Sequence, residues 1–152
     1  MCACRVAVTG ATGGIGRRIV ERLAASPEVT QVLLLDQRAR RDLPDKVEQQ
    51  IVDLRRPAAT PDLEGIDTLV HLPFAASAPR RRDGTLATTV TRNLLAGASA
   101  ADVRHLVVLS SATVYGAWPN NPVPITEVQP LRPVPEFAYA VGHAEVEQLV
   151  VD

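Results

Sequence analysis

The chain has 152 residues, of which 46% are hydrophobic and 22% charged, and its formal net charge is −1. This length fits one ordinary domain with a real core and leaves no room for two full domains. The balanced charge excludes a nucleic-acid binder that works through bulk charge, and it excludes an acidic disordered tail. No apolar run approaches the ~18 residues of a membrane span, and residues 1–8 lack the pattern of a signal peptide, so we expect a cytoplasmic protein.

Apolar runs and helical periodicity alternate along the chain. The apolar runs predict strands over residues 5–9, 31–36, 47–54, 67–72 and 104–110. Apolar residues at helical spacing predict helices over 15–25, 86–101 and 137–151, and a proline-rich stretch predicts an irregular loop over 118–135. Continuous Val and Leu strands that alternate with helices are typical of a parallel sheet between two helix layers. The predicted fold class is therefore α/β and doubly wound.

A glycine-rich loop joins the first predicted strand to the first predicted helix, with the spacing G-x-x-G-x-x-G. The first glycine of such a loop allows the tight turn, the second lets the backbone approach a pyrophosphate, and the third lets helix and strand pack closely. The helix N-terminus then offers free N–H groups to the phosphates. The residues that we predict to bind a dinucleotide here are Gly10, Thr12, Gly13, Gly14, Ile15 and Gly16.

An acidic residue, Asp36, ends the second predicted strand 20 residues after Gly16. A carboxylate at this place accepts the ribose hydroxyls of adenosine and repels a 2′-phosphate, which favours NAD over NADP. Arg38, like the nearby pair at 40–41, argues the other way because arginine can host a phosphate. We predict NAD as the cofactor, with Gln37 and Arg38 beside its ribose.

Polar residues with catalytic character follow the fifth predicted strand. Ser110 and Ser111 stand at its carboxyl end, where open α/β sheets bind their ligands. Tyr139 and His143 lie four residues apart in the last predicted helix, so their side chains share one face.

Several segments in the same order carry a resemblance to a known family. They are T-G-A-T-G-G-I-G (9–16), Asp36, D-L (53–54), H-L-P-F (71–74), S-S-A-T-V-Y-G (110–116), P-I-T-E (124–127) and the final tyrosine helix. The chain resembles the extended short-chain dehydrogenases/reductases, specifically the NAD-dependent sugar-nucleotide epimerases and dehydratases. The resemblance covers nearly all 152 residues and implies a single NAD-binding Rossmann domain over 1–152.

The resemblance also implies roles for individual residues. Ser111 would hydrogen-bond the substrate hydroxyl or keto oxygen, Tyr139 would move its proton as general acid or base, and NAD would exchange a hydride with the adjacent carbon. Further cofactor-binding positions implied by the family are Asp53 and Leu54 beside the adenine, and Leu72, Pro73, Phe74, Tyr139 and His143 elsewhere along the cofactor. The implied substrate is a small molecule such as a nucleotide sugar.

One departure from the family puts catalysis in question. The family has Tyr-x-x-x-Lys, and His143 stands at the lysine position. That lysine lowers the tyrosine pKa and binds the nicotinamide ribose; a free phenol has a pKa of about 10 and is a poor base near neutrality. Lys46, the single lysine of the chain, precedes the third strand on the adenosine side and is not expected to substitute. His143 is therefore a working substitute, a ribose ligand without a tuning role, or the mark of lost chemistry.

Other candidate residues carry weaker signals. Cys2 and Cys4 resemble half of a metal site, but no second Cys/His cluster completes it, so we predict no metal. The arginines at 80–82 are candidates for a diphosphate contact or for a solvated loop. His71 is expected to pack behind the cofactor, and Trp118 to stack on a base or line the substrate cleft.

Three hypotheses follow. The first is an NAD-dependent epimerase, dehydratase or reductase. The second is a module that binds NAD without turnover, because His143 and Ala87 replace a lysine and an asparagine of the family. The third is a homodimer through the helices near 86–101 and 138–151, which the family resemblance implies. A full family member needs roughly twice this length, so we expect a domain that stops before the last strands and the substrate-binding lobe, either as a piece of a longer protein or as a minimal form.

Overall fold

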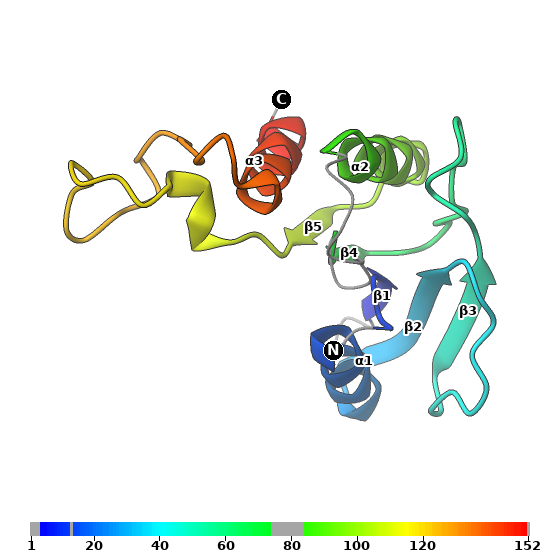
Figure 1. Cartoon of the computed structure of the whole chain (residues 1–152). Coiled ribbons are helices and arrows are strands. Elements are labelled where there is room, and N and C mark those ends of the chain that lie inside the picture. Colours follow the sequence, from blue (N-terminus) through cyan, green and yellow to red (C-terminus); the bar gives the residue numbers. More distant parts are fainter. Residues whose placement is uncertain (1–3, 13, 74–83, 152) are drawn as a thin grey trace.

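The computed structural model of the chain describes residues 4–12, 14–73 and 84–151, and it is built on one parallel sheet (Figure 1). The strands are β1 (Cys4–Thr9), β2 (Val29–Asp36), β3 (Val47–Ile51), β4 (Thr68–His71) and β5 (His105–Val108). The helices are α1 (Gly14–Ala25), α2 (Gly84–Ala100) and α3 (Ala138–Val151), and η1 (Ala112–Tyr115) is a single 3-10 turn. The predicted α/β class is confirmed.

The order of the strands is β3-β2-β1-β4-β5, and every pair is parallel. The chain starts in the middle of the sheet, moves outward through β2 and β3, and then returns to the other side of β1 with β4 and β5. The order reverses between β1 and β4. In doubly wound sheets ligands bind at this reversal, beyond the carboxyl ends of the strands.

Two hydrophobic cores lie on opposite faces of the sheet. In Figure 1, α1 lies on one side of the sheet and α2 and α3 lie side by side on the other. Strand residues that alternate along β1 show the division, because Val6 and Val8 belong to the core under α1 whereas Ala7 belongs to the core under α2. The buried members of the first core are Val6, Val8, Ala11, Val20, Val29, Val32, Leu34, Val47 and Leu72, and those of the second are Ala7, Leu35, Leu54, Leu63, Ile66, Leu69 and Leu94.

Two strands end two or more residues earlier than predicted, and β4 ends one residue earlier, at His71. The third strand was expected to run to residue 54, but β3 ends at Ile51, because the Asp53 carboxylate accepts the backbone N–H of Arg55 and turns the chain. The fifth strand was expected to run to residue 110, but β5 ends at Val108, and the chain then turns into η1 with Ser111 as its N-cap. Local side-chain hydrogen bonds compete with the sheet ladder at both places.

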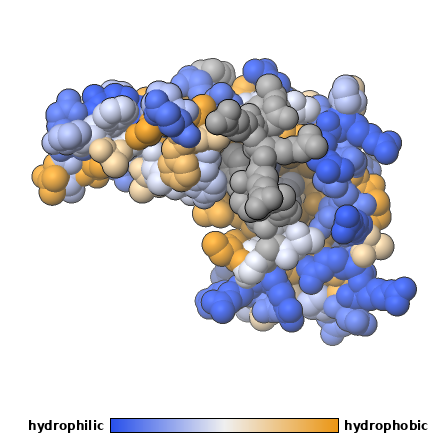
Figure 2. All heavy atoms as spheres, viewed as in Figure 1, coloured by the Kyte–Doolittle hydropathy of each residue, from blue (hydrophilic) through white to orange (hydrophobic). Residues whose placement is uncertain are grey.

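Residues 117–136 form an arm that extends away from the sheet in Figure 1. The arm contains turns and irregular backbone, as its prolines predict. Its base is held where the Arg132 N–H donates to the Val114 carbonyl at 2.9 Å. Val123 and Val128 are each more than nine-tenths exposed, and hydrophobic residues gather at the outer end of the arm in Figure 2.

Candidate functional site

The carboxyl ends of the strands bring the predicted site residues to one edge of the sheet. Register pairs Thr9 with Leu35, Asp36 with Ile51, and His71 with Val108. The glycine-rich loop, the acidic residue after β2, the His-Leu-Pro segment after β4 and the serines after β5 therefore all leave the sheet at the same edge. This edge includes the reversal point between β1 and β4, which is where the fold places a ligand.

The glycine-rich loop has the geometry that its spacing predicts. Gly10 has a φ of +67°, a conformation that other residues rarely adopt. A Cβ at Gly16 would lie 2.5 Å from the Gly10 carbonyl oxygen and 2.7 Å from the Ala11 Cα, so no larger residue fits there. Thr12 and Ile15 are exposed. The tight cradle fits a pyrophosphate at the start of α1.

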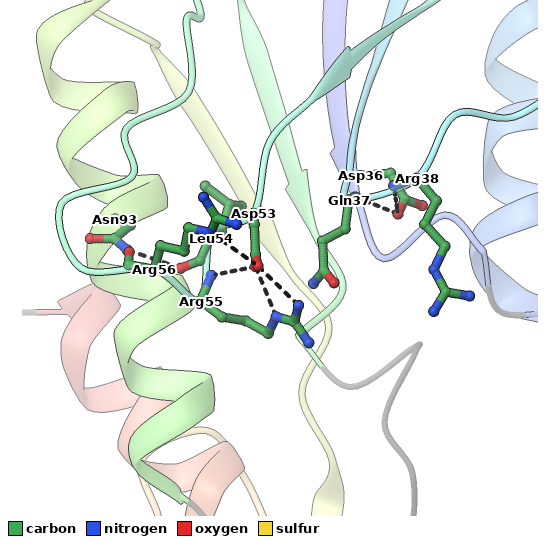
Figure 3. A network of polar contacts seen from close by, with 8 residues as sticks. All are labelled: Asp36, Gln37, Arg38, Asp53, Leu54, Arg55, Arg56 and Asn93. Atoms are coloured by element: carbon green, nitrogen blue, oxygen red, sulfur yellow. Dashed lines mark hydrogen bonds and ion pairs between the residues drawn. The ribbon is translucent and has the colours of Figure 1, made fainter.

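Asp36 closes β2 and organises the loop that follows. Its Oδ1 accepts the backbone N–H of Gln37 at 2.6 Å and that of Arg38 at 3.3 Å (Figure 3). Gln49 of β3 pins the same loop, since its amide donates to the Arg38 carbonyl at 2.6 Å and accepts from the Arg40 N–H at 2.7 Å. Sequence reasoning missed Gln49, because a glutamine in a strand carries no signal of such a partner.

The loop after β3 carries an ion pair at the position predicted to border the adenine. Arg55 contacts Asp53 through both carboxylate oxygens, at 2.8 and 2.9 Å, and the Arg55 side chain lowers the pKa of Asp53 to about 2 (Figure 3). The Asn93 amide of α2 donates to the carbonyls of Leu54 and Arg56 at 2.9 and 2.8 Å. The Asp53 carboxylate is thus ionised and held by arginine, an arrangement that the spacing of the sequence did not predict.

His71 and Leu72 stand at the end of β4. His71 is buried, and burial lowers its pKa to about 4, so its imidazole is neutral near pH 7. Leu72 is buried in the core under α1, and Pro73 is half-buried. The expectation that His71 packs behind the cofactor stays a prediction.

The serines after β5 differ in their partners. Ser111 caps η1, with its Oγ 2.9 Å from the Thr113 hydroxyl and accepting the Thr113 N–H at 3.3 Å. The Ser110 hydroxyl instead donates to the Glu147 carboxylate on α3. Ser111 and Thr113 together present two hydroxyl groups after β5, which is a chemistry suited to a carbonyl or hydroxyl oxygen of a substrate.

Tyr139 and His143 lie on one face of α3, and their ring planes are inclined at 69° to each other. The ring centroids are 4.4 Å apart in an edge-on arrangement. Tyr139 is 43% exposed, whereas His143 is 2% exposed. Burial lowers the pKa of His143, and the Glu147 carboxylate opposes this shift only in part, so the imidazole is neutral near pH 7.

Lys46 lies away from the site, and Trp118 has its contacts with the end of η1 and with the arm. Lys46 is held at the opposite edge of the sheet, where its Nζ donates to the carbonyls of Ser26 and Val29 at 3.2 and 3.1 Å. Trp118 stays within the arm: its indole N–H donates to the Arg132 carbonyl at 2.7 Å, and the Arg132 guanidinium lies 5.1 Å from its ring centroid. The expectation that Trp118 stacks on a base or lines the substrate cleft stays a prediction.

Several predicted residues lie outside the described part of the chain, namely Cys2, Gly13, Phe74 and the arginines at 80–82. Cys4 is a free thiol. Within residues 4–12, 14–73 and 84–151, no group of three His, Cys, Asp or Glu side chains is arranged to hold a metal ion. No helix in the same ranges is long and apolar enough to cross a bilayer.

The best-defined hollows in the described structure lie elsewhere. One, of about 260 Å³, lies along one face of the sheet over β1, β2 and β3, between polar residues that include Arg5, Glu48 and Asp62. The other, of about 430 Å³, lies between α2 and β5. The candidate site is defined here by its loops and by the register of the strands.

Known proteins resemble the chain throughout. L-arabinose 1-dehydrogenase (NAD(P)(+)) of Haloferax volcanii is 35% identical over 114 residues, which are 73% of this chain and 42% of that protein. A short-chain dehydrogenase/reductase superfamily protein from Agrobacterium tumefaciens, solved with bound NAD, superposes with a TM-score of 0.70 at 32% identity, covering 96% of this chain and 44% of that one. UDP-galactose 4-epimerase superposes with a TM-score of 0.74 at 28% identity, and the match covers 95% of this chain and 50% of that one.

The chain thus spans half the length, or less, of these three proteins. The family profile described as "NAD dependent epimerase/dehydratase family" matches residues 6–152, which is all but the first five residues. Its matched range runs from the buried part of β1 to the end of α3, and it includes every segment gathered at the carboxyl edge. The chain belongs to the NAD-dependent epimerase/dehydratase family.

Proposed function

We propose that the chain binds NAD along the carboxyl edge of its sheet and takes part in hydride transfer at a hydroxyl or keto carbon of a sugar-type substrate. The observation that carries the proposal is the cradle formed by Gly10 and Gly16 next to the Asp36 carboxylate. The cradle suits a pyrophosphate, and the carboxylate suits the two hydroxyls of an unphosphorylated adenosine ribose. Bound NAD supplies a carbon that accepts and returns a hydride.

The proposed polar groups for the substrate come from η1 and α3. Ser111 and Thr113 offer hydroxyls to the substrate oxygen, and Tyr139, which is 43% exposed, is the proposed group that moves its proton. The roles of Ser111 and Tyr139 are those that the family resemblance implies, whereas the role of Thr113 is proposed from its contact with Ser111. Relatives support a sugar as substrate, since their names include L-arabinose 1-dehydrogenase and UDP-galactose 4-epimerase.

A second candidate function is NAD binding with weak turnover or none, and the state of His143 favours it. The family lysine acts on the tyrosine through its positive charge. His143 is 2% exposed and neutral near pH 7, because burial lowers its pKa. A neutral imidazole does not supply the charge that promotes ionisation of a neighbouring phenol. We therefore propose that hydride transfer by this chain is slow.

One experiment separates these functions. NAD and NADP are titrated into the chain by calorimetry. Reduced cofactor is then followed with a uronate and L-arabinose, and conversion of UDP-galactose to UDP-glucose is followed by chromatography, because an epimerisation returns the hydride and leaves no reduced cofactor. We expect NAD to bind more tightly than NADP, turnover to be slow, and His143→Lys to raise it at least tenfold relative to the neutral control His143→Gln. Binding of neither dinucleotide overturns the proposal, and fast turnover by the wild type overturns the second candidate.

The proposed assembly is a homodimer through the helices near 86–101 and 138–151. The support is geometric, since α2 and α3 pack side by side on one face of the sheet and expose Leu86 and Val151. Light scattering tests the proposed dimer directly, and a mass near the 16.3 kDa of one chain would contradict it.

A further inference from the structure

A buried polar chain, which the proposed reaction does not use, links three elements at the carboxyl edge. Its centre is His71, which is 1% exposed, and its neighbours Thr9 and Thr91 are 4% and 1% exposed. Because the imidazole is neutral, one ring nitrogen donates a hydrogen bond and the other accepts one. The partners of each nitrogen therefore decide which nitrogen carries the proton.

The donor and the acceptor of each hydrogen bond in this chain of contacts can be assigned, starting from either end. At one end, the Thr91 hydroxyl donates to the Ala87 carbonyl at 2.8 Å, and this commits its single proton. Thr91 Oγ1, 3.0 Å from His71 Nε2, must then accept, so Nε2 carries the proton of the imidazole.

At the other end, His71 Nδ1 is left as an acceptor. Thr9 Oγ1 lies 2.7 Å from it and donates. Thr9 Oγ1 in turn accepts the backbone N–H of Leu72 at 3.2 Å. Every polar group has a partner when the bonds all run one way, from Leu72 through Thr9, His71 and Thr91 to the carbonyl of Ala87.

We call this series of hydrogen bonds, from Leu72 through Thr9, His71 and Thr91 to Ala87, the relay. Its members lie next to the segments predicted to hold the cofactor. Thr9 is the last residue of β1 and precedes Gly10, whose positive φ starts the phosphate-binding turn. Leu72 follows β4 and precedes Pro73. Thr91 lies in α2, beyond the strand reversal. The relay thus connects the start of the glycine turn to the residues after β4 and to α2, at the place where the strand order reverses.

We propose that His71 is a positioning residue for the dinucleotide: its one-way relay from Leu72 to Ala87 holds the Gly10 turn and the Leu72–Pro73 segment at the spacing that NAD requires. The proposal rests on the NAD-binding function proposed above. His71 itself is buried behind these segments and acts through Thr9 and Leu72.

Variants of the two threonines test the relay at residues that are buried and are not themselves proposed to contact NAD. Thr91→Val removes the acceptor of the Nε2 proton, and Thr9→Val removes both the donor to Nδ1 and the acceptor of the Leu72 N–H. Each leaves a buried polar group unpaired. We expect either change to weaken NAD binding about tenfold. Thr91→Ser and Thr9→Ser keep the hydroxyl and are expected to bind within about twofold of the wild type.

A core variant at the far edge of the sheet is the matched control. Val29→Ala opens space in the core under α1 at the amino end of β2, so it lowers stability without touching the relay. Far-UV circular dichroism and urea denaturation place all variants on one stability scale. NAD binding by Val29→Ala is expected to equal that of the wild type. If Val29→Ala loses as much affinity as Thr91→Val, the effect is loss of stability and the positioning role is overturned.

Two readouts test the relay independently of NAD. Nitrogen-15 NMR of the wild type is expected to show the Nε2–H tautomer of His71, and hydrogen exchange at the Leu72 amide is expected to accelerate in Thr9→Val but not in Thr9→Ser. An Nδ1–H tautomer overturns the direction of the relay. Unchanged NAD affinity in both valine variants overturns the positioning role while the proposed function stands. Failure of the wild type to bind NAD at all shows instead that the proposed function is wrong.

Discussion

His71 and His143 are both almost fully buried at the carboxyl edge of the sheet, and burial lowers both pKa values. Their surroundings differ. His71 lies between two threonine hydroxyls at 2.7 and 3.0 Å, whereas His143 meets the edge of the Tyr139 ring and lies near the Glu147 carboxylate.

The difference is instructive about how this edge is built. The glycine-loop region (residues 9–16 with 71–72) combines tight packing with a saturated set of hydrogen bonds. The α3 region (residues 137–147) keeps the tyrosine of the family but pairs it with a neutral, buried ring where the family has a cation. We infer that cofactor binding depends on the first region and that the rate of chemistry depends on the second.

The largest effect is expected from a methyl group in the glycine loop. Gly16→Ala places Cβ 2.5 Å from a backbone oxygen, so the loop or α1 must shift. Overpacking against backbone is expected to cost about 3 kcal/mol of unfolding free energy and to abolish NAD binding. Gly14→Ala is the control for stability, because a Cβ there meets nothing within 4 Å. Urea denaturation of both variants checks this, and equal stabilities would show that the loop is not tightly packed.

Acid is expected to weaken the fold through His71. Its pKa is about 4 in the folded chain against 6.5 ordinarily, because burial disfavours the charged ring. As the pH falls below 6.5, His71 becomes protonated in the unfolded chain, but in the folded chain it stays neutral down to about pH 4. The free energy of unfolding therefore decreases between these two pH values. The loss from this group amounts to about 3 kcal/mol.

His143 shifts in the same direction, so the comparison with His71→Gln isolates the contribution of His71. Urea midpoints measured from pH 7 to pH 4 are expected to fall less steeply in the variant. Parallel curves for the two proteins would mean that His71 titrates normally in the folded chain.

A smaller, local effect is expected in the arm. Trp118→Ala removes the hydrogen bond from the indole N–H to the Arg132 carbonyl. It also removes the contact between the Arg132 guanidinium and the indole ring. The local stability of the arm is expected to fall by about 1 kcal/mol, and NAD affinity is expected to stay the same. Hydrogen exchange of the arm amides measures the local stability, and calorimetry measures the NAD affinity. Weakened NAD binding would show that the arm supports the cofactor edge.

The smallest effect is expected from the ion pair after β3. Arg55 is about half exposed, so Arg55→Ala is expected to change the unfolding free energy by only about 0.5 kcal/mol. The pKa of Asp53 is expected to rise from about 2 toward its ordinary value of 3.8, because its main partner is gone. Carbon-13 NMR of the Asp53 carboxyl follows the titration. An unchanged pKa would mean that Arg56 or another cation holds the carboxylate.

Repeating patterns made most of the fold predictable. All five strands and three long helices were expected from apolar runs and helical spacing, and Gly10, Gly16 and Asp36 stand where their spacing indicates. The partners of these residues were not predictable. Thr9 and Thr91 are 62 and 20 residues from His71, and no local pattern links them. The burial of His143 depends on how α3 packs, which helical spacing alone does not specify.

The strand order has a consequence for how the edge is assembled during folding. In β1, Val6 pairs with Val32 only 26 residues later but also with Thr68, 62 residues later. The shorter loop closes at lower entropic cost, and pairings between distant residues slow folding. We expect β1, α1 and β2 to assemble first. The hydrogen bond between Thr9 and His71 then forms only when β4 pairs with β1. The turn that starts at Gly10 would then reach its final form only after β4 has paired with β1.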